Sequence, residues 1–440
     1  MKNKLIIVGL LCTLGLNGQS KKELREVETF VAGVHSITEV MFHDVINPPA
    51  AARFYAYATL AAHHVVNAAS PNPNSFDQHI NNYPKVPVLS ANINPFFAAT
   101  YAMLETAKAI IPSGMSLEEK QQKLEAQYLK AGVQPDVLNS SKAYAVEVGM
   151  VFAKYAAMDG YLELSVLPRY EPQSLDSTWY PTPPQYMMAV EPHWRTIKTF
   201  YLRGPGQFQP APPVAFDDRE DSEFYQLMTQ VYEVSQQLTP EQELIADFWD
   251  CNPFANLYSG HVMIGIKKIS PGGHWMGITG IVSKPEKLSF NRTVEVHAVV
   301  ATGLHDAFVS CWDEKYRSDR IRPKTAINRY LDQSWSPILE TPPFPEYTSG
   351  HSVISTTSAE LLTYLIGDHI SFVDNTEVFF GLPIRKFESF RHAANEAAIS
   401  RLYGGIHFLD AIEEGQVQGK NIAEFIISKM ESKTKEVSLK

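Results

Sequence analysis

Apolar residues recur along most of the chain at intervals of three and four positions, in alanine-rich stretches with few β-branched runs. This spacing lines one face of a helix with apolar side chains. Thr239-Pro-Glu-Gln242 adds a helix start, with Thr as N-cap, Pro at the first position and Gln completing a capping box. The pattern predicts helices over 53–69, 95–111, 117–131, 140–158, 221–237, 291–315, 352–366, 387–403 and 411–430. Without an alternating strand pattern or a repeat of fixed period, we expect an all-α fold built from helix bundles.

A proline-rich stretch interrupts this pattern. Ten prolines fall between Pro168 and Pro213, which excludes a continuous helix. Aromatic residues in the same stretch favour packing on a scaffold over a free linker. We therefore expect a helical region over 19–160, an irregular packed segment over 161–220, a helical domain over 221–432 and a polar tail over 433–440.

The N-terminus has the pattern of a secretory signal peptide. Lys2 and Lys4 precede an apolar stretch over 5–16 that is too short to span a membrane. We expect a signal peptide over 1–18 and export to the periplasm or the medium. No later stretch has the length of a membrane span. The net charge of −10 argues against nucleic-acid binding, because phosphate backbones require clustered Lys and Arg.

Two cysteines, Cys251 and Cys311, follow the predicted signal peptide. Export would permit a disulfide between them, but two cysteines do not establish one, and we favour buried free thiols. No Cys-x-x-Cys pair occurs, which argues against a structural zinc site. His-Glu-x-x-His is also absent, which argues against a metal-dependent hydrolase.

Candidate chemistry lies in the last third of the chain, in three segments. In the first, Lys315 and Arg322 are seven positions apart, so on a helix they would face nearly the same way. Pro323 then ends or bends the chain. A Lys and an Arg on one face suit a multiply charged oxyanion. A solvated basic stretch is the alternative for this segment.

The second segment, 342–351, runs from a proline-rich loop into Ser349-Gly350-His351. A helix that begins near His351 would direct a hydroxyl and backbone N–H groups at an anion. His351 could then act as a general acid or base. The alternative is an ordinary Ser-capped helix start with an exposed histidine.

The third segment, 399–410, places Arg401 and His407 around a pair of glycines. Glycine permits close backbone approach, and a histidine can be a nucleophile or a metal ligand. Asp410 or Glu413 could orient His407 through its other ring nitrogen. The alternative is a glycine break between helices, with a solvated arginine and a packed histidine.

Together, and in this order, the three segments resemble the signature of the superfamily of type 2 phosphatidic acid phosphatases and vanadium-dependent haloperoxidases. That signature comprises a Lys and an Arg-Pro separated by six residues, a Ser-Gly-His, and a Ser-Arg followed after five residues by His. The resemblance is most specific over 291–420. Two positions depart from it. Thr348 stands where the family has Pro, and the family's Asp after the last His would fall on Ala411 instead of Asp410.

The resemblance implies an oxyanion pocket formed by Lys315, Arg322, Ser349, Gly350 and Arg401. In the haloperoxidase branch the anion is vanadate, the vanadium ligand is His407, and hydrogen peroxide oxidises halide to hypohalous acid. Lys315 would polarise the peroxide, His351 would handle its protons, and Phe344 would shape the halide side. The size of the chain, its proline-rich approach to Ser349 and the lack of membrane spans favour this branch.

The same motif residues are compatible with two other functions. In the phosphatase branch the same pocket binds a phosphate ester, His407 attacks phosphorus and His351 protonates the leaving group. Phosphate and vanadate are nearly isosteric, so the motif residues do not separate the two enzymes. A non-enzymatic exported protein that binds an oxyanion is the third hypothesis, against which the complete set of anion-binding residues argues.

Overall fold

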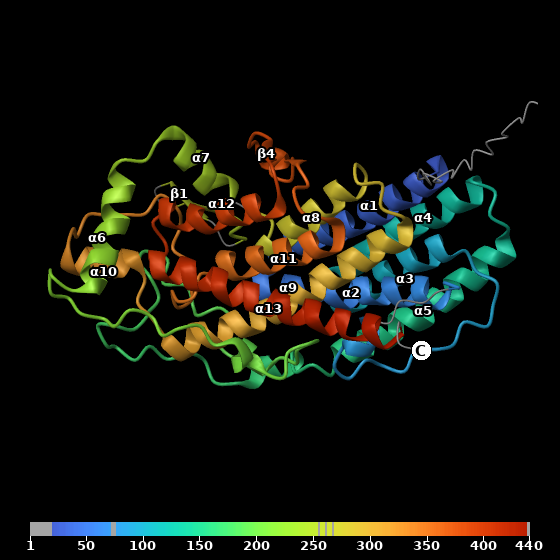
Figure 1. Ribbon diagram of the computed structural model, residues 1–440, viewed down its shortest axis with the longest axis horizontal. Helices are drawn as coiled ribbons and strands as arrows, with labels where there is room; N and C mark the ends of the chain where they lie inside the picture. The colour runs from blue at the N-terminus through green and yellow to red at the C-terminus, as the bar shows by residue number, and fades with distance from the viewer. Residues whose placement is uncertain (1–19, 72–75, 254–255, 260–261, 266–267, 438–440) are drawn as a thin grey trace, which may run out of the picture.

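The computed structural model describes residues 20–71, 76–253, 256–259, 262–265 and 268–437. The predicted signal peptide lies outside the described residues. The regular structure of the described chain is almost entirely helical (Figure 1). The α-helices are α1 (Lys21–His43), α2 (Pro48–Ala68), α3 (Pro95–Ile110), α4 (Glu118–Lys130), α5 (Pro135–Ala156), α6 (Glu223–Gln236), α7 (Pro240–Phe248), α8 (Pro271–Ser283), α9 (Phe290–Ser318), α10 (Pro323–Tyr330), α11 (Gly350–Ile366), α12 (Phe390–Tyr403) and α13 (Leu409–Val437).

The remaining regular structure is short. Six 3₁₀ turns are described, η1 (Phe76–His79), η2 (Gly114–Leu117), η3 (Leu162–Val166), η4 (Trp194–Thr196), η5 (Pro205–Phe208) and η6 (Val378–Phe380). The strands β1 (Asn256–Ser259) and β2 (Val262–Gly265) form one antiparallel hairpin, and β3 (Phe372–Asp374) and β4 (Arg385–Phe387) form another. Strands of three or four residues are too short to show an alternating pattern, which is why the sequence did not predict them. The all-α class is confirmed.

Each predicted helix is present, and cap chemistry fixes where several begin. At α2 the side chain of Asn47 accepts the Ala50 N–H at 2.9 Å and Pro48 takes the first helical position, so the helix starts five residues before the predicted one. At α7 the predicted capping box of Thr239 and Gln242 is formed. The last helix continues to Val437, into the expected polar tail.

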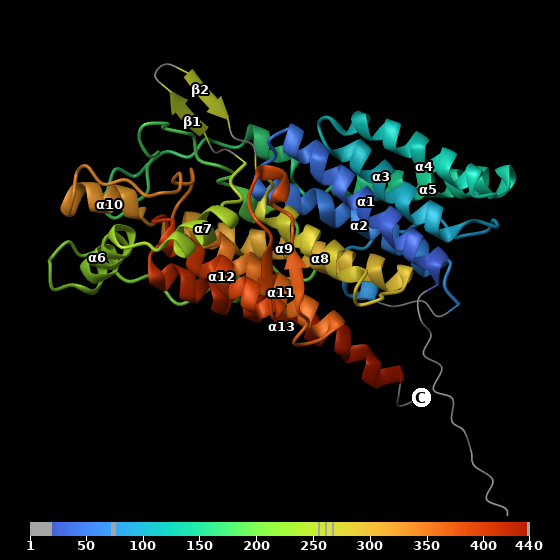
Figure 2. The same cartoon turned by 90° about the horizontal axis from the view of Figure 1, so that it is seen from above.

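Helix α9 is the centre of the molecule. Its residues are buried almost without interruption from Phe290 to Lys315. It lies between α2 on one side and α11 on the other, with α8 and α13 alongside (Figures 1 and 2). One hydrophobic cluster takes members from helices of both the N-terminal region and the C-terminal region. The two helical regions therefore share a core.

The proline-rich segment runs irregularly over this scaffold and is fixed to it by a buried carboxylate. Asp306 on α9 accepts the backbone N–H groups of Phe200 at 2.7 Å, Tyr201 at 2.7 Å and Leu202 at 3.0 Å. These bonds satisfy three consecutive donors that the irregular backbone would otherwise leave unpaired. Trp194 is fully buried in the same segment. The irregular backbone of this segment thus lies against the helical scaffold.

A buried ion pair joins the end of α5 to α2. The Arg53 guanidinium donates to Asp159 at 2.6 and 3.2 Å and to the carbonyl of Ala156 at 2.7 Å. The hydroxyl of Tyr57 donates to the same carboxylate at 3.0 Å. Every oxygen of this buried carboxylate is thus hydrogen-bonded, which is the condition under which a buried charge is tolerated.

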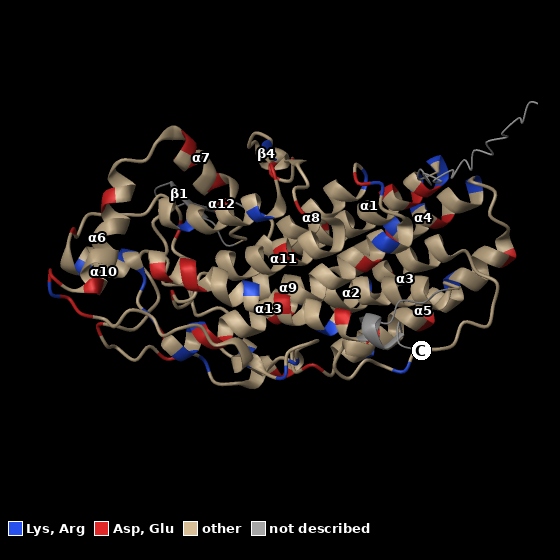
Figure 3. Cartoon of the chain, in the orientation of Figure 1, with Lys and Arg blue, Asp and Glu red and all other residues tan. Residues whose placement is uncertain are grey.

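Charged residues of both signs are interspersed over the outer helices and loops (Figure 3). Such mixing is typical of a surface that carries no large field of one sign. None of the helices in the described ranges is long and apolar enough to cross a membrane.

Candidate functional site

Lys315 lies in the last turns of α9, where its side chain is completely buried. The ammonium donates to three backbone carbonyls of the loop before α11, those of Pro345 at 3.2 Å, Glu346 at 3.0 Å and Thr348 at 2.5 Å. All three of its protons therefore point at one loop. The lysine fixes that loop and places a positive charge beneath it.

Arg322 reaches the same place by a route that the sequence did not predict. Helix α9 ends at Ser318, and Asp319 follows with a φ of +48°. Arg322 is extended and precedes Pro323, the first residue of α10. The expectation that Lys315 and Arg322 share a helix face is therefore wrong, because a left-handed residue ends the helix between them. Their side chains converge through the turn instead.

The buried Arg322 guanidinium spans the loop before α11 and the segment before α13. It donates to the carbonyls of Phe344 at 2.9 Å, Pro345 at 3.4 Å and Ile406 at 2.9 Å. Its Nη1 lies 3.2 Å from Nε2 of His407. An arginine can only donate, so this contact assigns a lone pair to that ring nitrogen.

His407 is held from its other side by Glu346. The imidazole Nδ1 lies 2.8 Å from Glu346 Oε1, and the backbone N–H of Phe408 donates to the same oxygen at 3.0 Å. A carboxylate at this position fixes the tautomer with the proton on Nδ1. Nε2 therefore carries a lone pair, which lies within reach of Arg322 and could be given to a metal or an electrophile.

Asp410 does not take the orienting role expected of it. Its two oxygens accept from Arg320 Nη1, each at 2.8 Å. Arg320 in turn lies 3.3 Å from Glu346 Oε2. Asp410 lies one position before the place where the family has its aspartate. One position on a helix rotates a side chain by about 100°, and this rotation directs Asp410 at Arg320. The sequence offered one signal for Glu346: it is the acidic residue in the loop 342–347, whose other residues are proline or aromatic.

Ser349 is the N-cap of α11, which was part of the alternative given for this segment. Its hydroxyl accepts the N–H of Ser352 at 3.4 Å, and its own N–H donates to the carbonyl of Ala411 at 2.9 Å. Gly350 is the first residue of α11, and a Cβ there would lie 3.9 Å from Cε of Lys315. The helix N-terminus and the lysine are thus adjacent.

His351 follows on the first turn of α11. Its Nε2 is buried and has no hydrogen-bond partner in the described part of the chain. Burial, with Arg401 and His407 nearby, holds its pKa well below the ordinary value. A buried ring nitrogen without a partner costs free energy, so its presence here indicates a group that binds there.

Arg401 is also buried, on α12, with few partners of its own. Its Nε donates to Ser400 Oγ at 2.9 Å and its Nη2 to the carbonyl of Ala246 at 3.4 Å. The glycines that follow serve packing. A Cβ on Gly404 would lie 2.6 Å from Leu339, and Gly405 has a φ of +73°. The close approach predicted for the glycine pair is therefore made by a neighbouring loop.

A cavity of about 50 Å³ lies where these segments meet. It is lined on one side by apolar groups and on the other by the predicted site residues. The apolar lining includes Phe308, Trp312, Ile354 and Phe344, and the polar lining includes Gly350, His351, Arg401 and His407. Lys315, Arg322 and Ser349 lie behind this lining and act through it.

The electrostatics of the pocket require an anion. Among the described residues, Lys315, Arg322 and Arg401 form no ion pair with a carboxylate. Burial lowers the pKa of Lys315 to about 8 and that of Arg322 to about 10, and it also lowers the pKa of Arg401. Burial and these three cations hold the pKa of His407 well below its usual range. Three cations beside a neutral imidazole would bind a multiply charged oxyanion.

Comparison with known proteins supports this assignment. A sequence model described as the VCPO second helical-bundle domain matches residues 295–436. The crystal structure of a protein described as the first bacterial vanadium-dependent iodoperoxidase is 42% identical, over 91% of this chain and 96% of that one, with a TM-score of 0.84. A holo-type bacterial vanadium-dependent chloroperoxidase shares the fold at 16% identity, over 88% of this chain and 92% of that one, with a TM-score of 0.65. No curated protein matches the chain.

The fold and the anion pocket define a helical protein of the vanadium haloperoxidase type. With a relative 42% identical over nearly its whole length, the chain belongs to the vanadium-dependent haloperoxidase family, which is a family of enzymes. The resemblance seen in the sequence is confirmed.

Proposed function

We propose that this enzyme uses hydrogen peroxide to oxidise halide to hypohalous acid, with vanadate as its cofactor. The observation that carries the proposal is the pocket of Lys315, Arg322 and Arg401 beside His407. Buried cations without carboxylate partners are stabilised when a multiply charged anion binds between them.

The residues fit vanadate. Glu346 holds the His407 proton on Nδ1, so Nε2 can serve as the metal ligand. The buried Nε2 of His351 has no partner in the described residues and faces the same anion site. Arg401 and the N-terminus of α11 would hold the oxygens of the anion, and Lys315 and Arg322 would add positive charge from behind them.

The chemistry that vanadate supplies when bound is Lewis-acid activation of hydrogen peroxide without a change in oxidation state. The chain contributes binding, orientation and proton transfer. His351 is neutral in the anion-free pocket and can accept a proton at Nε2 and later return it. Lys315, fixed by three carbonyls, holds a positive charge where negative charge gathers. Phe344 and Trp312 pack at a centroid distance of 5.0 Å and exclude water from the halide side.

Iodide is the halide that we propose first. The relative that is 42% identical is described as an iodoperoxidase. Iodide is also the most easily oxidised of the three common halides, so its oxidation requires the least oxidising power from the enzyme. Bromide and chloride then rank the oxidising power of the enzyme.

The test uses purified protein freed of metal and reconstituted with orthovanadate. Peroxide-dependent oxidation of iodide, bromide and chloride is measured for the wild type, for His407→Ala and for His193→Ala. His193 is a matched control, because its ring contacts the carbonyl of Pro168 at 2.6 Å, away from the pocket. We expect vanadate-dependent iodide oxidation in the wild type and in His193→Ala, and none in His407→Ala.

The same preparations without vanadate are tested on a chromogenic phosphate monoester. Phosphate release that depends on His407, without halide oxidation, would assign the enzyme to the phosphatase side. Vanadate binding without either activity would leave the role of an oxyanion-binding protein. Either result would refute the proposed oxidation.

A further inference from the structure

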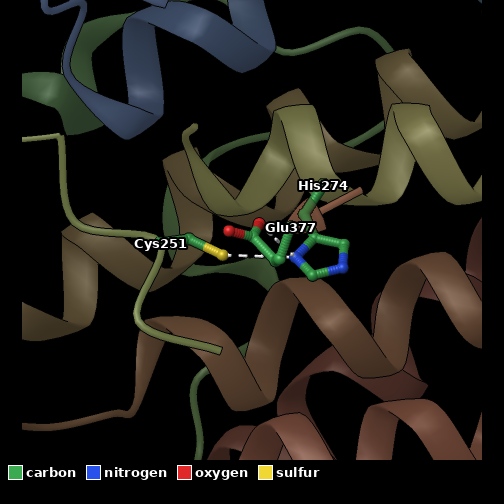
Figure 4. Close-up of side chains that lie close together, drawn as sticks. All are labelled: Cys251, His274 and Glu377. Carbon is green, nitrogen blue, oxygen red and sulfur yellow. Dashed lines mark hydrogen bonds and ion pairs between the residues drawn. The ribbon is translucent and has the colours of Figure 1, made fainter. Parts of the chain in front are cut away.

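Three buried side chains from distant segments meet beside the anion pocket. Cys251 follows α7, His274 lies in the first turns of α8, and Glu377 follows β3 (Figure 4). The His274 Nδ1 lies 3.3 Å from Cys251 Sγ and 3.3 Å from Glu377 Oε1. The expectation of free thiols is confirmed, since Cys251 and Cys311 are buried and unpaired. Cys251 also lines the wall of the cavity.

The His274 ring is held so that Nδ1 faces the other two members of the cluster. Its Nε2 lies 2.7 Å from Asp374 Oδ2. The hydroxyl of Thr376 donates to the other oxygen of Asp374 at 2.7 Å and lies 2.8 Å from the same Nε2, so the Nε2 proton is shared between Oδ2 and the Thr376 oxygen. The ring also stacks on Trp249, at a centroid distance of 4.5 Å and an interplanar angle of 16°. A histidine that ligates a metal is commonly oriented by a carboxylate in this way.

The distances suit ligands of one metal ion. For tetrahedral zinc, bonds of about 2.3 Å to sulfur and about 2.0–2.1 Å to nitrogen and oxygen put neighbouring S and N about 3.6 Å apart, and N and O about 3.4 Å apart. The two distances to Nδ1 are both 3.3 Å. The three ligand atoms all lie within 4.8 Å of one another. Both observed distances are slightly shorter than the zinc values, so Nδ1 would move a little away from the other two atoms when the ion binds.

Hydrogen bonding alone leaves the cluster incomplete. A Cys251 thiol can donate to His274 Nδ1, but Glu377 Oε1 is then buried and has no hydrogen bond among the described residues. The Glu377 side chain is only 2% exposed. The nearest charged group to this oxygen is the His274 ring, with Nδ1 at 3.3 Å. A cation between the three groups would satisfy this oxygen.

We propose that Cys251, His274 and Glu377 form a binding site for a divalent transition-metal ion of the zinc class, with Asp374 orienting the histidine. A thiolate and an imidazole beside one carboxylate favour zinc over magnesium or calcium, which take oxygen ligands. The ion would tie the cavity wall at Cys251 to α8 and to the hairpin of β3 and β4. Because its ligands come from three distant segments, such a site leaves no local spacing in the sequence, unlike a Cys-x-x-Cys pair.

The test is metal content, measured without vanadate on the purified chain, so its outcome is independent of halide oxidation. Chelator-treated protein is exposed to Zn²⁺, desalted and analysed by mass spectrometry of the metal. The variants are Cys251→Ser, Glu377→Gln and the matched control Cys311→Ser, which makes the same change at the other buried thiol. We expect one zinc per chain in the wild type and the control, and affinity at least tenfold weaker in the other two variants.

Cobalt substitution adds a direct view of the ligands. Co²⁺ in the wild type should give a thiolate-to-metal charge-transfer band in the near ultraviolet, and Cys251→Ser should lose it. The proposal is overturned if the wild type retains no zinc, or if Cys251→Ser and Glu377→Gln retain as much as the wild type. Should either variant fail to fold, the cobalt spectrum of the wild type decides alone, and bound cobalt without the thiolate band overturns the proposal.

Discussion

Replacing Glu346 by Gln should weaken oxyanion binding without removing any group that touches the anion. The carboxylate accepts from His407 Nδ1 at 2.8 Å and from the Phe408 N–H at 3.0 Å. Glutamine keeps the shape but loses the charge, and a charge-assisted hydrogen bond contributes about 1.5–3 kcal/mol. That range corresponds to a loss of roughly 10–100-fold in affinity, which matches the usual effect of removing the partner of a metal-ligating histidine.

The assay is calorimetric titration of the metal-free protein with orthovanadate, followed by a thermal melt of each variant. Asp410→Asn is the matched control, because Asp410 pairs with Arg320 as Glu346 does but does not contact His407. We expect the control to bind vanadate within about threefold of the wild type, since 0.6 kcal/mol is about the scale of a change at an independent site. Equal or greater weakening in Asp410→Asn would refute the assignment of Glu346 as the positioning residue of His407.

Four further predictions follow from the structure. Burial lowers the pKa of Lys315 to about 8, so its ammonium loses a proton above that pH and the affinity for sulfate should fall as the pH rises through about 8. Lys315→Met should flatten this pH profile. The measurement is titration with sulfate between pH 6.5 and 9.5, which extends roughly 1.5 units on either side of that pKa. Sulfate does not itself titrate in this range. Asp159→Ala leaves Arg53 buried and unpaired and should lower the free energy of unfolding by about 3–5 kcal/mol in urea denaturation. His351→Ala should lower the rate of halide oxidation by about 10²–10⁴-fold with a smaller effect on vanadate affinity, measured by steady-state kinetics and calorimetry. The signal peptide expected from the sequence predicts export, and mass spectrometry of protein recovered from outside the cytoplasm should then show a chain that begins after residue 18.

The sequence predicted most of the longer helices from their apolar spacing and missed α1, α8 and α10. The capping box at Thr239 and the helix after Ser349 were readable because the groups involved lie within three residues of each other. Helix α8 was not predicted, because its glycines have low helix propensity. In the structure these glycines allow close packing, and a Cβ on Gly280 would lie 2.7 Å from Val31.

For the candidate site, the sequence predicted the motif residues but not the hydrogen bonds that join distant segments. The motif residues around His407 were identified from short spacings, and the structure brings them together around one cavity. The pairing of His407 with Glu346, and of Arg320 with Asp410, was not predictable, because each joins residues that are far apart in the sequence. The left-handed turn at Asp319 was also missed, since an aspartate in that conformation has no distinctive neighbours.

The central position of α9 has a consequence for dissecting the protein. The family model matches only residues 295–436, but the helix that opens this segment is covered by α2 and α1 on its other side. Expressed alone, the matching segment would expose that apolar face to water, and large exposed apolar faces lead to aggregation. A working minimal unit must therefore include the N-terminal helices, although none of the predicted anion-binding residues lies on them.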